Sequence, residues 1–330
     1  MPDGAPVKLL LAPMEGLADA LMRELLCAVG GYDWAVSEFA RVTGTALPDR
    51  FFRRVSPELE RGALTATGTP VRLQLLGSDP GWMGENARRL ARLGPAGIDL
   101  NFGCPAPTVN RHRGGAVLLD EPDLLYRIAS EVRRQVPATI PVTAKMRLGV
   151  RDTGRTLECG HALADGGVGQ LVVHARTKLD GYRPPAHWPW VGRLASSLPI
   201  PVVANGEVWC EADWRRCLAE SGVQDVMLGR GAVADPFLAR RIRSGESFHA
   251  GRDWPELATL IGEFWLRVQR KVAARHAPGR LKQWLNLLRR CYPQAEALFS
   301  AVRQVPDVAR IGAVLAAADV RPLLSARNAA

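Results

Sequence analysis

Short apolar runs recur along the first 230 residues, and longer amphipathic segments rich in Ala, Leu and Arg separate them. The runs span residues 8–12, 34–37, 71–75, 97–100, 142–145, 170–173, 202–204 and 225–228. The intervening segments include 80–93 and 122–136, which read as helices. Alternating strands and helices predict a parallel sheet, and eight such units are what a closed (β/α)₈ barrel requires. A doubly wound open sheet is the alternative.

Polar or glycine-rich clusters follow every one of these runs. They begin at Met14, Glu38, Gln74, Asn101, Lys145, His174, Asn205 and Gly229. Barrel enzymes assemble their sites at the C-terminal ends of the strands. Loops are polar in most proteins, but eight successive clusters that contain Lys, Cys, His, Gln, Asn and Arg favour a functional site there.

The pattern changes near residues 240–252, where small and polar residues interrupt it. Beyond this point the segments 254–277, 280–292, 294–304 and 308–318 predict helices, separated by Pro278-Gly279, Pro293 and Pro306. We therefore expect two domains, a barrel over 1–242 and a small all-helical domain over 243–330.

Charge is distributed unevenly between these two parts. The chain of 330 residues has a formal net charge of +10, yet residues 1–239 hold 27 basic and 26 acidic residues. Residues 240–330 hold 16 basic and 7 acidic residues, a net charge of +9. A basic helical domain beside a nearly neutral barrel predicts a polyanionic partner for the helical part.

The cysteines and the N-terminus indicate where the protein works. The six Cys include no CxxC pair and no Cys/His spacing typical of zinc, so we expect reduced thiols and no metal. Residues 1–14 lack the charged start and long apolar stretch of a signal peptide, and no segment reaches the ~18–20 apolar residues of a membrane span. These features predict a cytoplasmic protein without a membrane partner.

The last two strand ends favour a phosphate site. Asn205-Gly206-Glu207 and Gly229-Arg230-Gly231 place small residues and backbone N–H groups where many barrels bind phosphate, and Arg230 could pair with the anion. No GxGxxG opens a helix after the first strand, so a Rossmann nucleotide site is not supported.

Lys145 and Gln74 allow two kinds of chemistry. A lysine suits the negative charge that reduction leaves near N1 and O2 of a flavin, and a glutamine amide suits its pyrimidine edge. A lysine in a barrel mouth could instead form a Schiff base. Residue type alone does not separate these alternatives.

Cys104 lies in Asn101-Phe102-Gly103-Cys104-Pro105, directly after the fourth run, where a thiol meets substrate rather than packs in a core. It could serve as a nucleophile, a metal ligand or a proton donor; without partner ligands metal is disfavoured. His174 ends the sixth run and is a candidate base.

Seven motifs together resemble the tRNA-dihydrouridine synthases. They are residues 11–16 (LAPMEG), 71–77 (VRLQLLG), 98–105 (IDLNFGCP), 145–149 (KMRLG), 173–177 (VHART), 203–207 (VANGE) and 227–231 (MLGRG). The resemblance runs in order along nearly the whole chain. It implies an FMN-dependent (β/α)₈ barrel with a C-terminal helical domain, which reduces uridine in the tRNA D-loop with NADPH and which we expect to be a monomer.

Carried over by position, the resemblance assigns roles to individual residues. Cys104 would be the catalytic acid that protonates C5 of the uracil after hydride reaches C6. Uridine or tRNA would contact Asn101, Lys178 and Tyr182. The flavin would be held by Pro13, Met14, Glu15, Gln74, Lys145, His174, Asn205, Gly206, Glu207, Gly229 and Arg230.

A subfamily is also indicated. Residues 38–42 (EFARV), 280–285 (RLKQWL) and Val302-Arg303 resemble the bacterial branch that modifies uridine 16, in which Arg41, Arg280, Lys282 and Arg303 would orient tRNA. The chain departs from the family after Asn110, where Arg111-His112-Arg113 replaces a Gly/Ser-rich loop. The alternatives are another D-loop uridine, a free small molecule as substrate, or an RNA-binding protein with an inactive barrel.

Overall fold

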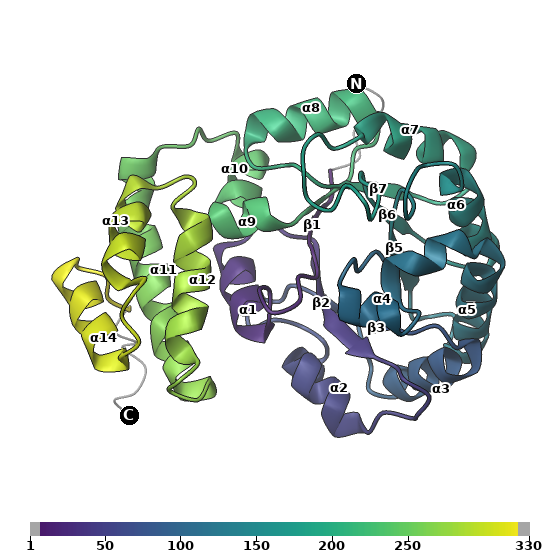
Figure 1. The fold of residues 1–330 in the computed structure, drawn as a ribbon, viewed down its shortest axis with the longest axis horizontal. Helices are drawn as coiled ribbons and strands as arrows, with labels where there is room; N and C mark the ends of the chain where they lie inside the picture. The colour runs from purple at the N-terminus through teal and green to yellow at the C-terminus, as the bar shows by residue number, and fades with distance from the viewer. Residues whose placement is uncertain (1–6, 323–330) are drawn as a thin grey trace. The chain divides into compact units, whose positions relative to one another are not determined.

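A computed structural model describes residues 7–322. Residues 1–6, part of the segment assessed for a signal peptide, and residues 323–330, the end of the predicted helical domain, lie outside the described range. Eight parallel strands pair in sequence order, and β1 pairs with β8 to close a barrel (Figure 1). The barrel prediction is confirmed, and the open-sheet alternative is wrong. The strands are β1 Leu9–Leu11, β2 Trp34–Arg41, β3 Val71–Leu76, β4 Ile98–Phe102, β5 Val142–Arg147, β6 Leu171–His174, β7 Val202–Asn205 and β8 Val226–Leu228.

Helices follow the strands and surround the barrel (Figure 1). The two segments predicted as helices form α3 and α5, each with Pro in its first turn, and Asp79 caps α3 by accepting a hydrogen bond from the Trp82 N–H at 2.8 Å. The helices of this part are α1 Ala20–Val29, α2 Asp49–Val55, α3 Pro80–Ala91, α4 Pro107–Arg111, α5 Pro122–Gln135, α6 Thr156–Asp165, α7 Trp188–Ser197 and α8 Glu211–Ser221, with 3₁₀ turns at Pro57–Arg61 and Gly115–Asp120.

Apolar side chains form one part of the barrel core. Leu10, Val36, Val172, Val203 and Met227 form a buried cluster. Buried polar residues on β3, β4 and β5 form another part, namely Gln74, Asp99 and Thr143. The core is closely packed, and its polar groups extend beneath the strand ends.

Strand β2 runs four residues beyond its predicted end. The pairing with β3 shifts between Val36 and Phe39, so β2 carries one extra residue there. Such a bulge bends a strand and redirects its side chains. Beyond the bulge, residues 39–41 pair with residues 74–76 of β3, so Glu38 and Arg41, expected in a loop, lie within the strand.

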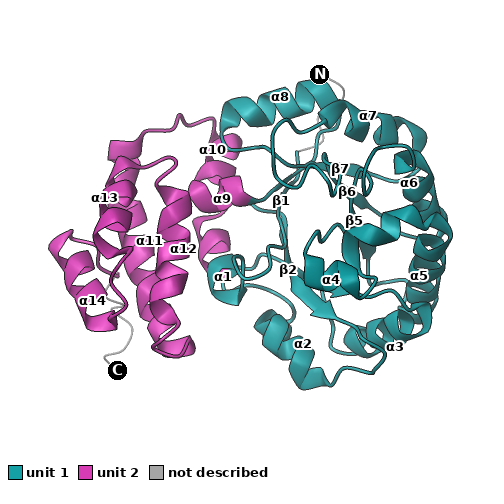
Figure 2. Cartoon of the chain, viewed as in Figure 1, with its two compact units in different colours: residues 1–23, 32–229 teal, residues 24–31, 230–330 magenta. Residues whose placement is uncertain are grey.

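The chain divides into two compact units, residues 1–23 with 32–229 and residues 24–31 with 230–330 (Figure 2). Between residues 230 and 322 the second unit consists of helices and the short connections between them. The predicted helix 254–277 in fact starts at Ala250 and ends at Lys271, because His249 caps its N-terminus by accepting from the Arg252 N–H at 3.2 Å. Its helices are α9 Arg230–Ala234, α10 Leu238–Ser244, α11 Ala250–Lys271, α12 Ala277–Leu288, α13 Pro293–Val302 and α14 Val308–Ala317.

Each unit contains buried ion pairs. In the first, Arg23 contacts Glu58 at 2.9 Å. In the second, Arg241 contacts both Asp235 and Asp253, the latter at 2.8 Å. Loss of one partner from such a pair leaves an uncompensated buried charge, so these contacts strongly constrain each unit.

Candidate functional site

Strand register brings the predicted polar residues to one end of the barrel. Asn101 on β4 is paired with Lys145 on β5, and His174 on β6 is paired with Asn205 on β7. The C-terminal ends of parallel strands lie at one mouth, where barrel enzymes carry out their chemistry. Four residues predicted from separate motifs therefore line one site.

Lys145 is 9% exposed, and its Nζ donates a hydrogen bond to Asn205 Oδ1 at 2.9 Å. Asn205 in turn donates from Nδ2 to the Met227 carbonyl at 2.8 Å, which fixes the orientation of its amide. Burial, with the neighbouring charge of Arg147, lowers the pKa of Lys145 to about 7, although Asp99 opposes the shift. The amine is therefore poised to gain a proton when an anion binds beside it.

Hydrogen bonds to its backbone N–H and to its carbonyl hold Cys104, the predicted catalytic residue, in place. Asn101 Oδ1 accepts from the backbone N–H of Cys104 at 2.9 Å and from that of Gly103 at 3.0 Å. Asn110 Nδ2 donates to the Cys104 carbonyl at 2.9 Å. Gly115 has a φ of +68°, and a Cβ added to it would lie 2.6 Å from the same carbonyl oxygen. The loop thus packs closely against the residues that follow it.

The thiol of Cys104 is partly buried, and burial is the main cause that raises its pKa above the ordinary value. A thiol with a raised pKa stays neutral at physiological pH. A neutral thiol can donate a proton, whereas a nucleophile requires the thiolate. The environment of Cys104 favours the acid role.

A layer of arginines supports the His174 side of the mouth. The His174 ring lies 6.0 Å from the Tyr182 ring, centroid to centroid, and the Arg147 guanidinium lies 5.2 Å from the Tyr182 ring. Buried Arg176 forms an ion pair with Glu207. Arg176 Nη1 also lies 3.5 Å from His174 Nε2, so His174 is flanked by Arg176 and by the Tyr182 ring, and Tyr182 itself is exposed.

Two glycines allow close packing at the last strand ends. Gly206 has a φ of +114°, and an added Cβ would lie 2.8 Å from the His174 ring, so a side chain here would displace that ring. A Cβ added to Gly229 would meet Met14 Sδ at 3.9 Å and Asn205 Nδ2 at 4.0 Å, which are ordinary van der Waals distances. Gly206 therefore lets His174 approach the backbone closely, and Gly229 brings the first loop and Asn205 together.

The first loop covers another part of the mouth. Met14 packs against the buried barrel cluster, and its carbonyl accepts from the N–H groups of Leu17 and Ala18. Pro13 and Glu15 flank it in the same loop. Met14 thus brings this loop, which contains all three predicted residues, next to Gly229.

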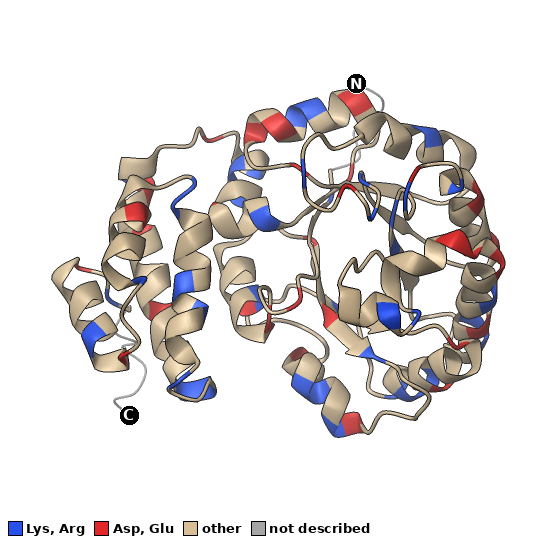
Figure 3. Ribbon diagram, viewed as in Figure 1, with Lys and Arg blue, Asp and Glu red and all other residues tan. Residues whose placement is uncertain are grey.

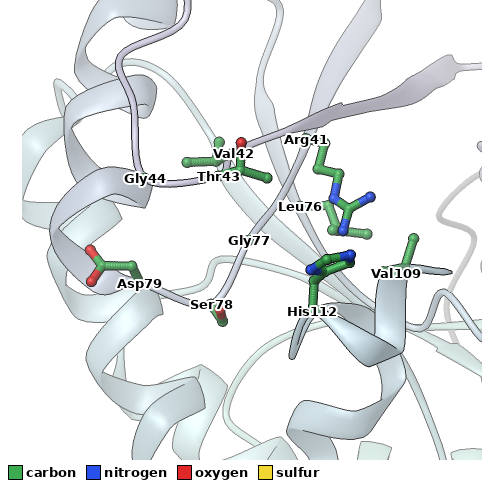
Figure 4. Close-up of a pocket in the computed structure, with 11 residues that line it drawn as sticks. Arg41, Val42, Thr43, Gly44, Leu76, Gly77, Ser78, Asp79, Val109 and His112 are labelled. Carbon is green, nitrogen blue, oxygen red and sulfur yellow. The ribbon is translucent and has the colours of Figure 1, made fainter. Parts of the chain in front are cut away.

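A pocket of about 240 Å³ lies beside the α4 helix that follows Cys104 (Figure 4). Arg41 reaches it from the end of β2 and donates to the Thr108 carbonyl at 3.3 Å. His112, from the segment that departs from the family pattern, also lines the pocket and points toward Arg41 (Figure 4), and neighbouring Arg113 pairs with Glu121 at 2.7 Å. The remaining lining comes from Val42, Thr43, Gly44, Leu76, Gly77, Ser78, Asp79, Val109 and Gly114.

The other predicted RNA-contact residues lie elsewhere in the sequence. Lys178 is half-buried in the loop after β6, and its N–H donates to the Gly149 carbonyl. The remaining predicted RNA-contact residues belong to the helical unit, where Arg280 and Lys282 lie on α12 and exposed Arg303 follows α13. Arg230, which was predicted to hold the flavin, begins α9 in the same unit. Figure 3 shows Lys and Arg on helices of both units.

Three residues that hold the site together were missing from the predicted set: Asp99 and Arg147, which are buried, and Asn110, which is half-buried. Asp99 accepts from Gln74, Asn110 holds the Cys104 carbonyl, and Arg147 donates to the carbonyls of Gly103 and Thr177 at 2.9 and 3.0 Å. The alternation of side chains along a strand could have identified two of them from the sequence. Asp99 and Arg147 stand two residues from Asn101 and Lys145, on the same strand face.

Among residues 7–322, no helix is long and apolar enough to cross a membrane. In the same range, no group of three or more His, Cys, Asp or Glu side chains is arranged to hold a metal ion.

Comparisons with known proteins identify the family of this chain. Residues 10–298 match the family model described as dihydrouridine synthase (Dus). A tRNA-dihydrouridine(16) synthase of Ralstonia nicotianae is 55% identical, covering 93% of this chain and 95% of the relative. The protein of that name from Neisseria meningitidis serogroup A is 47% identical, covering 93% of both chains.

Solved structures resemble the fold at low sequence identity. 2-Naphthoyl-CoA reductase gives a TM-score of 0.56 at 12% identity, over 72% of this chain and 50% of that one. An old yellow enzyme homologue from Zymomonas mobilis gives 0.50 at 14% identity, over 73% and 90%. The family match spans most of the chain and the predicted motifs meet at one barrel mouth, so this protein belongs to the dihydrouridine synthase family of oxidoreductases.

Proposed function

We propose that this chain reduces the C5=C6 bond of uridine 16 in the tRNA D-loop to 5,6-dihydrouridine. The observation that carries the proposal is the Cys104 loop at the barrel mouth, held by Asn101 next to Lys145. Relatives about 55% identical over nearly their full length bear the name tRNA-dihydrouridine(16) synthase, which supports both the substrate and the position.

The residues of the mouth fit flavin mononucleotide. Gly229 brings Met14 of the first loop close to Asn205 of the seventh strand end, so residues assigned to the flavin from two motifs meet at this position. Burial lowers the pKa of Lys145 to about 7, and a negative charge bound beside the amine would favour its protonated form, so Lys145 can supply a cation to an anionic ligand. We assign the flavin to Pro13, Met14, Glu15, Gln74, Lys145, His174, Asn205, Gly206, Glu207, Gly229 and Arg230.

Reduced flavin, once bound, supplies a hydride for C6 of the uracil. Cys104 Sγ donates the proton that completes the reduction at C5, and its raised pKa keeps that proton in place until it is needed. Asn101 keeps the Cys104 backbone in register and has one Nδ2 proton left for the base. Lys145 balances the negative charge that reduction brings to the mouth.

The substrate must leave the tRNA stack to reach this mouth, at a cost of a few kcal/mol. Phosphate contacts from basic residues offset that cost and set the register without reading sequence. We assign the barrel, 1–242, to catalysis and the basic helical part, 243–330, to tRNA binding. The proposed contacts are Arg41, Asn101, Lys178, Tyr182, Arg280, Lys282 and Arg303. We further propose NADPH as electron donor and a cytoplasmic monomer as the working form.

The test supplies tRNA from a strain lacking dihydrouridine and maps the modified positions by sequencing. Dihydrouridine at position 16 is expected, and modification at another D-loop position would overturn the tRNA-orienting roles. A protein that binds no flavin, or one that reduces only free small molecules, would overturn the reaction itself. Cys104→Ala should keep NADPH-driven flavin reduction and lose dihydrouridine formation. Cys210→Ala, at an exposed cysteine, is the matched control.

A further inference from the structure

A directional chain of hydrogen bonds runs beneath the mouth and ends at Asp99. The Cys104 N–H donates to Asn101 Oδ1 at 2.9 Å, Asn101 Nδ2 donates to Gln74 Oε1 at 2.7 Å, and Gln74 Nε2 donates to Asp99 Oδ2 at 2.7 Å. The other Asp99 oxygen, Oδ1, accepts from the Thr143 hydroxyl at 2.6 Å. Every donor in this chain points toward Asp99.

The two ends of the chain determine the orientation of both amides. A backbone N–H can only donate, so Asn101 must turn its oxygen toward Cys104 and its nitrogen toward Gln74. Gln74 must then turn its own nitrogen toward Asp99, which has to accept. Because a hydroxyl can either donate or accept, Thr143 Oγ1 can accept a hydrogen bond from a protonated Oδ1 if Asp99 is neutral, while Oδ2 continues to accept from Gln74.

Asp99 does not reach the mouth itself. It is 1% exposed, and the charged groups acting on it are those of Arg72 and Lys145. Its influence on the reaction must therefore pass through Gln74 and Asn101, both buried in the same part of the barrel.

We propose that Asp99 is a positioning residue: as the terminal acceptor it orients Gln74 and Asn101, and through them it holds the Cys104 loop. The orientation also leaves Asn101 with an N–H to present to a carbonyl of the base, as uracil has at C4 and cytosine does not. This consequence for the base rests on the proposed function, whereas the hold on the Cys104 loop does not.

The experiment combines two conservative substitutions. In Asp99→Asn the new amide can keep its oxygen on Gln74 if its nitrogen donates to Thr143, so the chain survives. Thr143→Val alone leaves Asp99 as the acceptor. In the double variant the nitrogen of the introduced amide no longer has the Thr143 hydroxyl as its acceptor. The amide then has no reason to prefer the orientation that keeps its oxygen on Gln74.

The first readout is the alkylation rate of Cys104 in flavin-free protein, followed by mass spectrometry with exposed Cys210 as the reference. The double variant should change the Cys104 rate at least fivefold, and each single variant less than twofold. Equal rates in all four proteins, or an effect of Asp99→Asn as large as that of the double variant, would overturn the proposal. The second outcome would assign Asp99 to balancing the charges of Arg72 and Lys145.

The second readout is single-turnover dihydrouridine formation by the reduced holoenzyme. The double variant should lose at least tenfold in rate with little change in the tRNA concentration for half-saturation, while Asp99→Asn stays within about threefold of the unmodified protein. A rate loss in the double variant equal to the product of the losses in the two single variants would overturn the proposal. Unmodified protein that makes no dihydrouridine would overturn the proposed function, and the alkylation result would still decide the role of Asp99.

Discussion

Lys145 destabilises the flavin-free protein, and replacing it with Met should reveal this as a pH-dependent gain in stability. Burial lowers the pKa of the amine to about 7 in the folded chain, against about 10.4 for an unfolded lysine. Between these values the unfolded chain binds more protons than the folded chain, so stability rises with pH across this window. Below pH 7 both states are protonated and the penalty is at its maximum.

The size of the effect follows from the two pKa values. At 1.36 kcal/mol for each pKa unit, the buried amine costs about 4 kcal/mol at pH 7 and about 2 kcal/mol at pH 9. Lys145→Met removes this cost. It also removes the hydrogen bond to Asn205, whose contribution to stability is to a first approximation independent of pH above 7. The gain over the unmodified protein should therefore shrink by about 2 kcal/mol from pH 7 to pH 9.

The assay is urea unfolding of flavin-free protein at both pH values, followed by tryptophan fluorescence. Lys271→Met, at an exposed lysine that ends α11, controls for the loss of one charge. Asp99→Asn, tested with and without the Lys145 substitution, controls for the neighbouring carboxyl. A stability difference between Lys145→Met and the unmodified protein that is the same at pH 7 and pH 9 would refute the reasoning.

Three further substitutions test the supporting structure. Gly115→Ala forces a side chain onto a left-handed backbone beside the catalytic loop, and should cost about 1–3 kcal/mol in thermal unfolding and slow dihydrouridine formation more than flavin reduction. Glu58→Gln should cost about 3–5 kcal/mol at pH 7 because it leaves Arg23 buried without a counter-charge. Burial alone would raise the pKa of Glu58, but Arg23 lowers it overall. The cost of Glu58→Gln in urea unfolding should therefore shrink as the pH falls below the ordinary carboxyl range, and an unchanged cost would contradict this. Tyr292→Phe removes a hydroxyl that donates to Asp235 at 2.9 Å and should cost about 1–3 kcal/mol by thermal unfolding, with flavin uptake unchanged.

The strand count and the site motifs were accessible from the sequence because both are local signals. Apolar runs reveal buried strands wherever they occur, and each polar cluster directly follows one of them. The motif around Cys104 is contiguous, so its residues could be identified before any fold was known.

The boundaries of β2 and α11 were not accessible in the same way. The end of β2 depends on a bulge created by its pairing with β3, and the start of α11 depends on a cap from His249. Both are decided by where hydrogen-bond partners lie, which the periodicity of side chains does not encode.

By itself the sequence determined the barrel, the basic helical part and the family, because hydrophobic periodicity, charge and contiguous motifs are properties of neighbouring residues. Only the tertiary structure decided that Lys145 donates to Asn205, sixty residues away, and that Cys104 is tied to Asp99 through two amides. Such contacts join residues that barrel closure and strand register bring together. Their donors and acceptors, and the pKa shifts they cause, exist only once the strands are aligned.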